Sequence, residues 1–130
     1  MTLVDTSVWI NYFHGKRCSQ TDLLTALISE YKDICICGLI LTEILQGIKS
    51  DSKFNNVKKL LSELIYLPIT KHSFIQAATT YRSIRKHGQT IRSPIDCIIS
   101  SICIEHEVPI LHDDRDFEII AKHSKLKIAK

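Results

Sequence analysis

The sequence lacks the features that mark membrane, secreted and disordered proteins. No apolar run approaches the roughly 20 residues that a bilayer-spanning helix requires. The N-terminus, MTLVDTSVW, has no basic segment and reaches an acid at position 5, unlike a signal peptide. Only four glycines and three prolines occur in 130 residues, which excludes a collagen-like or low-complexity chain. We therefore expect a globular protein with no membrane association.

Cysteine is present, but not in a disulfide or zinc pattern. The five cysteines are an odd number, and no CxxC pair occurs among Cys18, Cys35, Cys37, Cys97 and Cys103. The pair His106–Glu107 lacks the second histidine of an HExxH motif. These features favour buried, reduced thiols in a cytoplasmic protein over a disulfide framework or structural zinc.

Composition indicates one domain spanning residues 1–130. Hydrophobic residues make up 45% of the chain and charged residues 24%, the balance of a globular protein. The net charge of +3 is too small to identify a nucleic-acid binder by itself. The chain also has no GxSxG, GxGxxG or P-loop motif, so these nucleophile and phosphate-binding signatures are excluded.

Short apolar strands alternate with amphipathic helices along the chain. The expected strands cover residues 1–4, 33–37, 65–69, 108–111 and 126–129. The expected helices cover residues 6–13, 21–32, 39–48, 54–64, 74–86, 116–122 and a segment that begins at Pro94, preceded by Ser93 as a cap. Apolar strands that alternate with helices predict an α/β protein, with a central parallel sheet of 4–5 strands flanked by helices in three α/β/α layers.

Acidic residues follow several of these strands. They lie at strand ends or on the helix that comes next: Asp5, Glu43, Asp96, Asp113, Asp114 and Asp116. Parallel sheets place ligands at the carboxyl ends of their strands. Carboxylate oxygens are the ligands that hard cations such as Mg²⁺ and Mn²⁺ prefer, and such an ion would offset the repulsion between clustered acids. The pattern thus favours a joint metal site.

Each acid also has a simpler structural explanation. Asp5 and Asp114 are each suited to cap the helix that follows, and Asp96 lies three residues after Ser93, where an acid completes a capping box. Glu43 is harder to explain, because its apolar segment LILTEIL places no lysine or arginine three or four residues away. A buried glutamate is costly, so Glu43 must find its partner elsewhere in the fold.

Three segments together resemble the PIN-domain family, and within it the VapC-type toxins of toxin–antitoxin pairs. They are VDTSVWI at 4–10, LTEILQGI at 41–48 and TIRSPIDCIISSICIEHEVPILHDDRDFEIIA at 90–121. The resemblance implies a compact α/β/α fold and a Mg²⁺- or Mn²⁺-dependent endoribonuclease that hydrolyses RNA through a metal-activated water. It also implies a homodimer that is silenced by a cognate VapB-like antitoxin.

The resemblance assigns roles residue by residue. It matches the four metal-binding and catalytic acids of the family to Asp5, Glu43, Asp96 and Asp114. It matches supporting positions to Asp116 and to the hydroxyl residues Thr6 and Ser7. Two positions depart from the family pattern, since His112 stands where threonine or serine is common and Asn11 where many relatives carry aspartate. Neither departure removes one of the four core acids, so we expect an active nuclease.

The three aspartates of DDRD have different expected roles. If the strand continues through His112, Asp114 lies at the carboxyl end of the strand with the other acids, whereas Asp113 points to the opposite face. We therefore expect Asp114 to bind metal and Asp113 to be exposed. Asp116 is expected to cap the last helix or to support the metal ligands.

Four basic residues are candidates for contacts with the RNA backbone: Arg82, Arg85, Lys86 and Arg92. The first three fit a solvated helix face at least as well. Arg92 is the better candidate because it directly precedes the Ser93–Asp96 turn.

Two other function classes remain open at this stage. One is a phosphatase with Asp5 as nucleophile on a similar α/β fold, although its family has a second aspartate where this chain has Ser7. The other is a non-catalytic RNA- or protein-binding module. Assays of RNA cleavage and of phosphate-ester hydrolysis separate the three classes.

Overall fold

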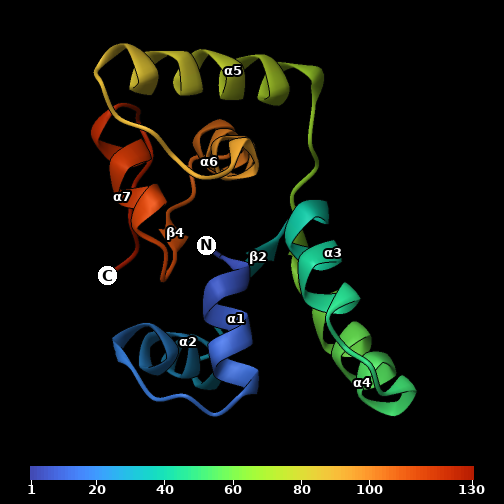
Figure 1. Ribbon diagram of the computed structural model, residues 1–130. Coiled ribbons are helices and arrows are strands. Elements are labelled where there is room, and N and C mark those ends of the chain that lie inside the picture. Colours follow the sequence, from blue (N-terminus) through green and yellow to red (C-terminus); the bar gives the residue numbers. More distant parts are fainter.

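The four strands form one parallel sheet. The computed structural model describes residues 1–130 (Figure 1). The strands are β1 (Thr2–Val4), β2 (Ile34–Ile36), β3 (Ile65–Tyr66) and β4 (Ile110–Leu111). They pair in the order β3-β2-β1-β4, with all neighbours parallel. The expected parallel sheet is confirmed.

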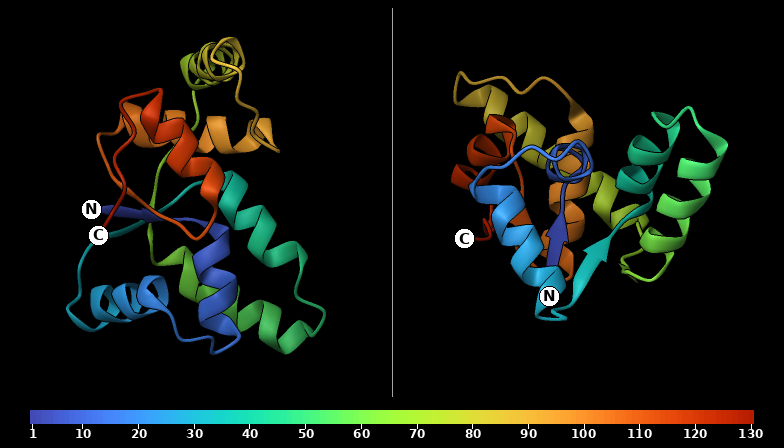
Figure 2. Two further views of the ribbon diagram at one scale, coloured as in Figure 1. Left: turned by 60° about the vertical axis from the view of Figure 1, so that its left-hand side comes forward. Right: turned by 90° about the horizontal axis from the view of Figure 1, so that it is seen from below.

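Seven helices cover the two faces of this sheet. On one side α1 (Thr6–Phe13) contacts α2 (Ser19–Ser29) and α3 (Gly38–Gln46), and α3 contacts α4 (Asp51–Ser62). On the other side α5 (Lys71–Lys86), α6 (Pro94–Glu105) and α7 (Arg115–Lys122) contact one another. The left view of Figure 2 shows the sheet between these groups. None of the helices has the length and apolar character needed to cross a membrane.

The order of the strands reverses beside β1. The chain moves outward from β1 to β2 and β3 through helices on one face, and then returns to the far side of β1 through α5 and α6 on the other. Strand order therefore reverses between β1 and β4, where the N–H of Asp5 donates to the carbonyl of Leu111 at 2.9 Å. Open parallel sheets bind ligands at such a reversal, because the connecting helices diverge there.

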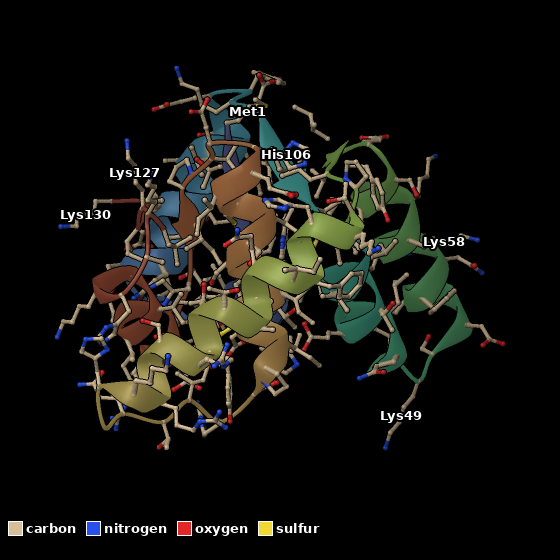
Figure 3. All side chains as sticks on the ribbon, turned by 90° about the horizontal axis from the view of Figure 1, so that it is seen from above. Met1, Lys49, Lys58, His106, Lys127 and Lys130 are labelled. Atoms are coloured by element: carbon tan, nitrogen blue, oxygen red, sulfur yellow. The ribbon has the colours of Figure 1, made fainter.

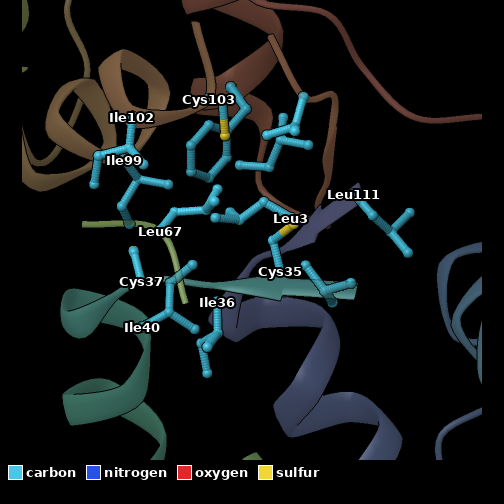
Figure 4. Close-up of a cluster of buried hydrophobic side chains, with 14 of the residues drawn as sticks. Leu3, Cys35, Ile36, Cys37, Ile40, Leu67, Ile99, Ile102, Cys103 and Leu111 are labelled. Atoms are coloured by element: carbon cyan, nitrogen blue, oxygen red, sulfur yellow. The ribbon is translucent and has the colours of Figure 1, made fainter. Parts of the chain in front are cut away.

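One cluster of 27 buried residues forms the core. Figure 4 shows its central part, in which Leu3 and Cys35 from the strands lie between Ile102 of α6 and Ile40 of α3. All five cysteines are unpaired and four of them are buried. Burial raises the pKa of Cys97 to about 12, so this thiol remains protonated at neutral pH.

Two helices begin earlier than the sequence predicts. α4 begins at Asp51 rather than 54 because Ser50 accepts a hydrogen bond from the N–H of Lys53, and α5 begins at Lys71 rather than 74 because Thr70 and Ser73 form a capping box. The polar first turns of both helices carry no apolar periodicity, so only their caps mark them. The expected strand at 126–129 is reduced to a single parallel bridge between Ile110 and Ile128.

Candidate active site

Asp5 stands at the strand-order reversal and is held by Ser7. Its side chain caps α1 and accepts hydrogen bonds from the N–H and the hydroxyl of Ser7, at 3.1 and 2.7 Å. The Ser7 hydroxyl in turn accepts from the N–H of Asp113 at 3.0 Å, which joins the ends of β1 and β4. Burial raises the pKa of Asp5, although the Ser7 hydrogen bonds act in the opposite direction.

Glu43 finds its partner on α1. The hydroxyl of Thr6 donates to a Glu43 oxygen at 2.9 Å, which accounts for an acid in an otherwise apolar helix segment. Burial and, less strongly, the charge of Asp5 raise the pKa of Glu43. Thr6 and Ser7, the two hydroxyl residues expected to support the site, thus each hold a different acid.

Asp96 is the acid whose charge is least compensated. It lies in the first turn of α6, whose cap Ser93 accepts from the N–H of Ile95. The Asp96 carboxylate accepts no hydrogen bond, so the capping box considered for it does not form. Burial, followed by the charge of Asp114 and of the other acids, raises the pKa of Asp96 to about 7.

The last helix is capped by Asp114 and not by Asp116. Asp114 accepts from the N–H of Asp116 at 3.0 Å, so of the two alternative roles expected for Asp116, cap or support of the metal ligands, the cap is wrong. Asp116 is 3% exposed and accepts instead from the backbone N–H of Arg92 at 3.0 Å. The difference arises from the loop before α6, which supplies Asp116 with a partner that lies 24 residues away in the sequence.

Three of these acids converge closely enough to share a cation. One oxygen each of Asp96, Asp114 and Asp116 lies within 4.8 Å of the others. Asp5 and Glu43 are near enough for their charges to contribute to the raised pKa of Asp96. The structure therefore brings together every acid singled out from the sequence except Asp113. Asp116 was expected only to support the metal ligands, but it is one of the three acids that lie closest together.

Arg92 contacts this acid cluster directly. Its Nη2 donates to Asp114 at 3.0 Å and its Nε lies 3.6 Å from Asp116, while 76% of its side chain remains exposed. The guanidinium thus covers part of the cluster and still faces solvent. Arg82, Arg85 and Lys86 are exposed on α5 and form no ion pair with the acids, as a solvated helix face would.

The two residues that depart from the family pattern both contact the segment after β4. Asn11 donates to the exposed carboxylate of Asp113 at 3.0 Å. His112 is buried, its Nδ1 accepts from the N–H of Asp114 at 3.1 Å, and its Nε2 lies 3.2 Å from Glu118. Sequence reasoning did not give His112 a role. The only available signal was an imidazole two residues before an acid, a spacing that suits a side-chain acceptor for that acid's N–H.

Comparison with known proteins identifies the family of the chain. The family model described as PIN domain matches residues 2–123. The chain is 34% identical to VapC ribonuclease Mb1587 of Mycobacterium bovis and to Ribonuclease VapC11 of Mycobacterium tuberculosis, and the match covers 99% of this chain and 98% of each relative.

Solved structures share the fold at low sequence identity. VapBC2 of Rickettsia felis, bound to a DNA fragment from its promoter, matches with a TM-score of 0.76 at 16% identity, over 98% of this chain and 96% of that one. FitAcB of Neisseria gonorrhoeae matches with a TM-score of 0.72 at 18% identity, over 100% and 97%. The chain belongs to the PIN domain family and resembles VapC ribonucleases over nearly its full length.

Proposed function

We propose that this protein is a Mg²⁺- or Mn²⁺-dependent endoribonuclease, the toxin of a VapBC-type toxin–antitoxin pair, formed by residues 1–130 as a single domain. The observation that carries the proposal is the convergence of Asp96, Asp114 and Asp116 at the strand-order reversal, beside Asp5 and Glu43. The relatives that are 34% identical bear the name ribonuclease, which supports the same activity here.

The residues present fit a divalent cation. Three carboxylate oxygens, from the first turn of α6 and from the cap and first turn of α7, lie within 4.8 Å of one another, and hard cations are held by such oxygens. Asp96 accepts no hydrogen bond and has a pKa near 7, so its charge is poorly compensated by the protein alone. A cation at this point supplies the missing positive charge, and Asp96, Asp114 and Asp116 would hold it, with Asp5 and Glu43 as neighbouring ligands.

The rest of the mechanism follows from the side chains around the cluster. A bound Mg²⁺ or Mn²⁺ would lower the pKa of a water and offset charge on a phosphate, as divalent ions do in phosphodiester hydrolysis. Ser7 and Thr6 fix the orientation of Asp5 and Glu43 by direct hydrogen bonds. Arg92, charged and mostly exposed, is placed to bind a phosphate oxygen of the RNA beside Asp114. No side-chain nucleophile is needed.

More distant contacts with RNA are proposed for α5. Arg82, Arg85 and Lys86 are exposed on its C-terminal half and are free to bind backbone phosphates. Such contacts position an RNA strand without reading its sequence, so their loss should weaken binding uniformly.

Two apolar surfaces support the proposed protein partners. A groove of 360 Å³, here called the α1–α2–α4 groove, is lined mainly by apolar residues that include Trp9, Tyr12 and Leu60. It suits an amphipathic segment of a VapB-like antitoxin. Separately, Phe74 and Ile75 of α5 are 50% and 54% exposed, which suits burial in a homodimer. The five unpaired thiols suit the reducing cytoplasm in which RNA, antitoxin and toxin would meet.

An RNA cleavage assay tests the activity. We expect cleavage with Mg²⁺ or Mn²⁺, none in excess EDTA, and at least a hundredfold loss in Asp96→Asn, while the exposed Asp113→Asn retains near-normal activity. Full activity in EDTA contradicts metal dependence. Hydrolysis of a small phosphate ester without RNA cleavage indicates a phosphatase, and RNA binding without either reaction indicates a binding module.

A further inference from the structure

A second pocket opens between α1 and α3, and Glu43 is the one acid of the cluster that lines it. Its volume is 190 Å³. Ile10 and Phe13 of α1 form one wall, Glu43 and Gly47 form the other, and Lys49 and Lys53 lie at the outer end. This pocket lies outside the α1–α2–α4 groove and the exposed apolar surface of α5.

Glu43 connects the pocket to the acid cluster. Its carboxylate accepts a hydrogen bond from Thr6, and both residues lie one helical turn before pocket residues: Thr6 before Ile10 on α1, and Glu43 before Gly47, which caps the end of α3. The two helix faces therefore continue from the acids into the pocket without interruption. A ligand whose phosphate lies at the acids extends naturally in this direction.

The pocket has the size and chemistry of a site for one planar ring. A cavity of about 150 Å³ lined by aliphatic and aromatic residues accommodates benzene, so 190 Å³ suits a single nucleobase ring. Ile10 is 40% exposed and offers an apolar face against which a ring can pack. At Gly47 an added Cβ would meet nothing closer than the Ile44 carbonyl oxygen at 3.7 Å, so the absent side chain leaves the space open.

The charge at the outer end is positive. Lys49 and Lys53 are exposed and form no ion pair. Figure 3 shows Lys49 projecting from the turn between α3 and α4, whereas Lys58 points outward from the far side of α4. A ring-sized pocket with partly apolar walls, which has a carboxylate at one end and two free lysines at the other, matches a nucleotide chain better than a peptide.

We propose that this pocket receives the base of one unpaired RNA nucleotide next to the scissile phosphate, with Lys49 and Lys53 on the phosphates that follow. The proposal rests on the ribonuclease function proposed above. It restricts the substrate to RNA that is single-stranded at the cleavage site, because a base stacked and paired in a duplex cannot enter a side pocket.

Two variants test the pocket with a matched control. Gly47→Leu fills it, and the φ of −85° at Gly47 accepts a side chain without backbone strain. Lys49→Gln/Lys53→Gln removes the outer charges. Lys58→Gln/Lys59→Gln is the control. Both lysines are exposed on α4, the helix that also carries Lys53, and neither lines the pocket. Circular dichroism and melting temperatures confirm that each variant is folded.

The measurements are steady-state cleavage of a short single-stranded RNA and its anisotropy-detected binding. We expect Gly47→Leu to raise KM about tenfold or more, the typical range for loss of one stacked base, with a smaller effect on kcat. The double lysine variant should raise KM and reduce the log–log salt dependence by about 0.7 per lysine, while the control changes neither. An abasic site in the RNA next to the cleaved bond should weaken wild-type binding but not that of Gly47→Leu.

The outcomes separate the two proposals. Suppose that the wild type cleaves RNA normally and that the variants show the same KM, salt dependence and sensitivity to an abasic site. This result overturns the proposed base pocket and leaves the proposed ribonuclease function standing. Absence of cleavage by the wild type overturns the proposed function, and the anisotropy comparison then still decides on the pocket. If Gly47→Leu weakens inhibition by an antitoxin and leaves RNA binding unchanged, the pocket belongs to a protein partner and the RNA proposal is overturned.

Discussion

The buried ring of His112 accepts a hydrogen bond from the backbone N–H of Asp114, with Nδ1 and N separated by 3.1 Å. An imidazole nitrogen that accepts carries no proton, so the proton of this neutral ring lies on Nε2, which faces Glu118 at 3.2 Å. The ring also packs against Phe117, with 5.3 Å between centroids. His112 therefore fixes the turn that presents Asp114 to the acid cluster.

Loss of the His112 acceptor should weaken the site. His112→Ala leaves the Asp114 N–H without its partner and should reduce Mg²⁺ affinity about tenfold to a hundredfold, as is usual for groups that orient metal ligands. His112→Asn should lose less Mg²⁺ affinity than His112→Ala, because an asparagine oxygen can accept a hydrogen bond from the N–H two residues later in the chain. Calorimetric titration with Mg²⁺ measures both. Equal Mg²⁺ affinity in the alanine variant and the wild type would show that the turn before Asp114 keeps its conformation without the imidazole acceptor.

Metal-free stability should fall as pH rises, because the pKa of Asp96 is about 7 in the folded protein and about 3.9 in an unfolded chain. Between these values the folded state binds a proton that the unfolded state has lost, so the free energy of unfolding decreases from pH 4 to pH 7. In EDTA at pH 7.5, Asp96→Asn should melt about 3–5 °C above the wild type. The difference should vanish near pH 4.

Scanning calorimetry across this pH range provides the measurement. Asp5 and Glu43 also have raised pKa values, so a shallower slope of the same sign should persist in the variant. Addition of Mg²⁺ should raise the melting temperature of the wild type more than that of Asp96→Asn, because ligand binding stabilises the folded state by mass action. A wild-type melting temperature that rises from pH 4 to pH 7 in EDTA would contradict the electrostatic reading.

Replacement of each of the three aspartates after β4 by asparagine should affect activity and stability differently. Asp114→Asn keeps the α7 cap, since asparagine caps as well as aspartate, but removes a cluster charge, so activity should fall strongly with little loss of stability. Asp116→Asn should lower activity and also stability, because a neutral amide weakens the charge-assisted contacts of this buried side chain with the N–H and the guanidinium of Arg92. Asp113→Asn should change little. Cleavage rates at saturating Mg²⁺ and melting temperatures give the order, and an order led by Asp113 would refute the assigned geometry.

Arg92 should influence metal and RNA in opposite directions. Its guanidinium competes with a cation for Asp114, so Arg92→Gln should tighten Mg²⁺ binding severalfold. The same change removes a phosphate contact and should raise the KM for RNA, with Arg82→Gln as the milder comparison. Metal titration and cleavage kinetics on one preparation separate the effects. A fall in Mg²⁺ affinity would mean that Arg92 supports the acids rather than competing for them.

Local signals in the sequence predicted some features fully and others only in part. Ser93 and Pro94 identified the start of α6 because cap and first-turn preferences act within a few residues. Glu43 was expected to need a distant partner, but Thr6 could not be identified, because that contact depends on how α1 packs on α3. Likewise, either Asp114 or Asp116 suits a helix cap, and only the loop that carries Arg92 decides between them.

The α1–α2–α4 groove contains the chain's only tryptophan, so intrinsic tryptophan fluorescence reports on this groove alone. Trp9 lines the groove, is 1% exposed, stacks on Phe13 at 5.7 Å and has a buried indole N–H without a partner. Indole fluorescence responds to hydrogen bonding at that N–H and to displacement of a neighbouring ring. Occupation of the groove is thus readable in unlabelled protein, in the same cuvette in which RNA cleavage is followed.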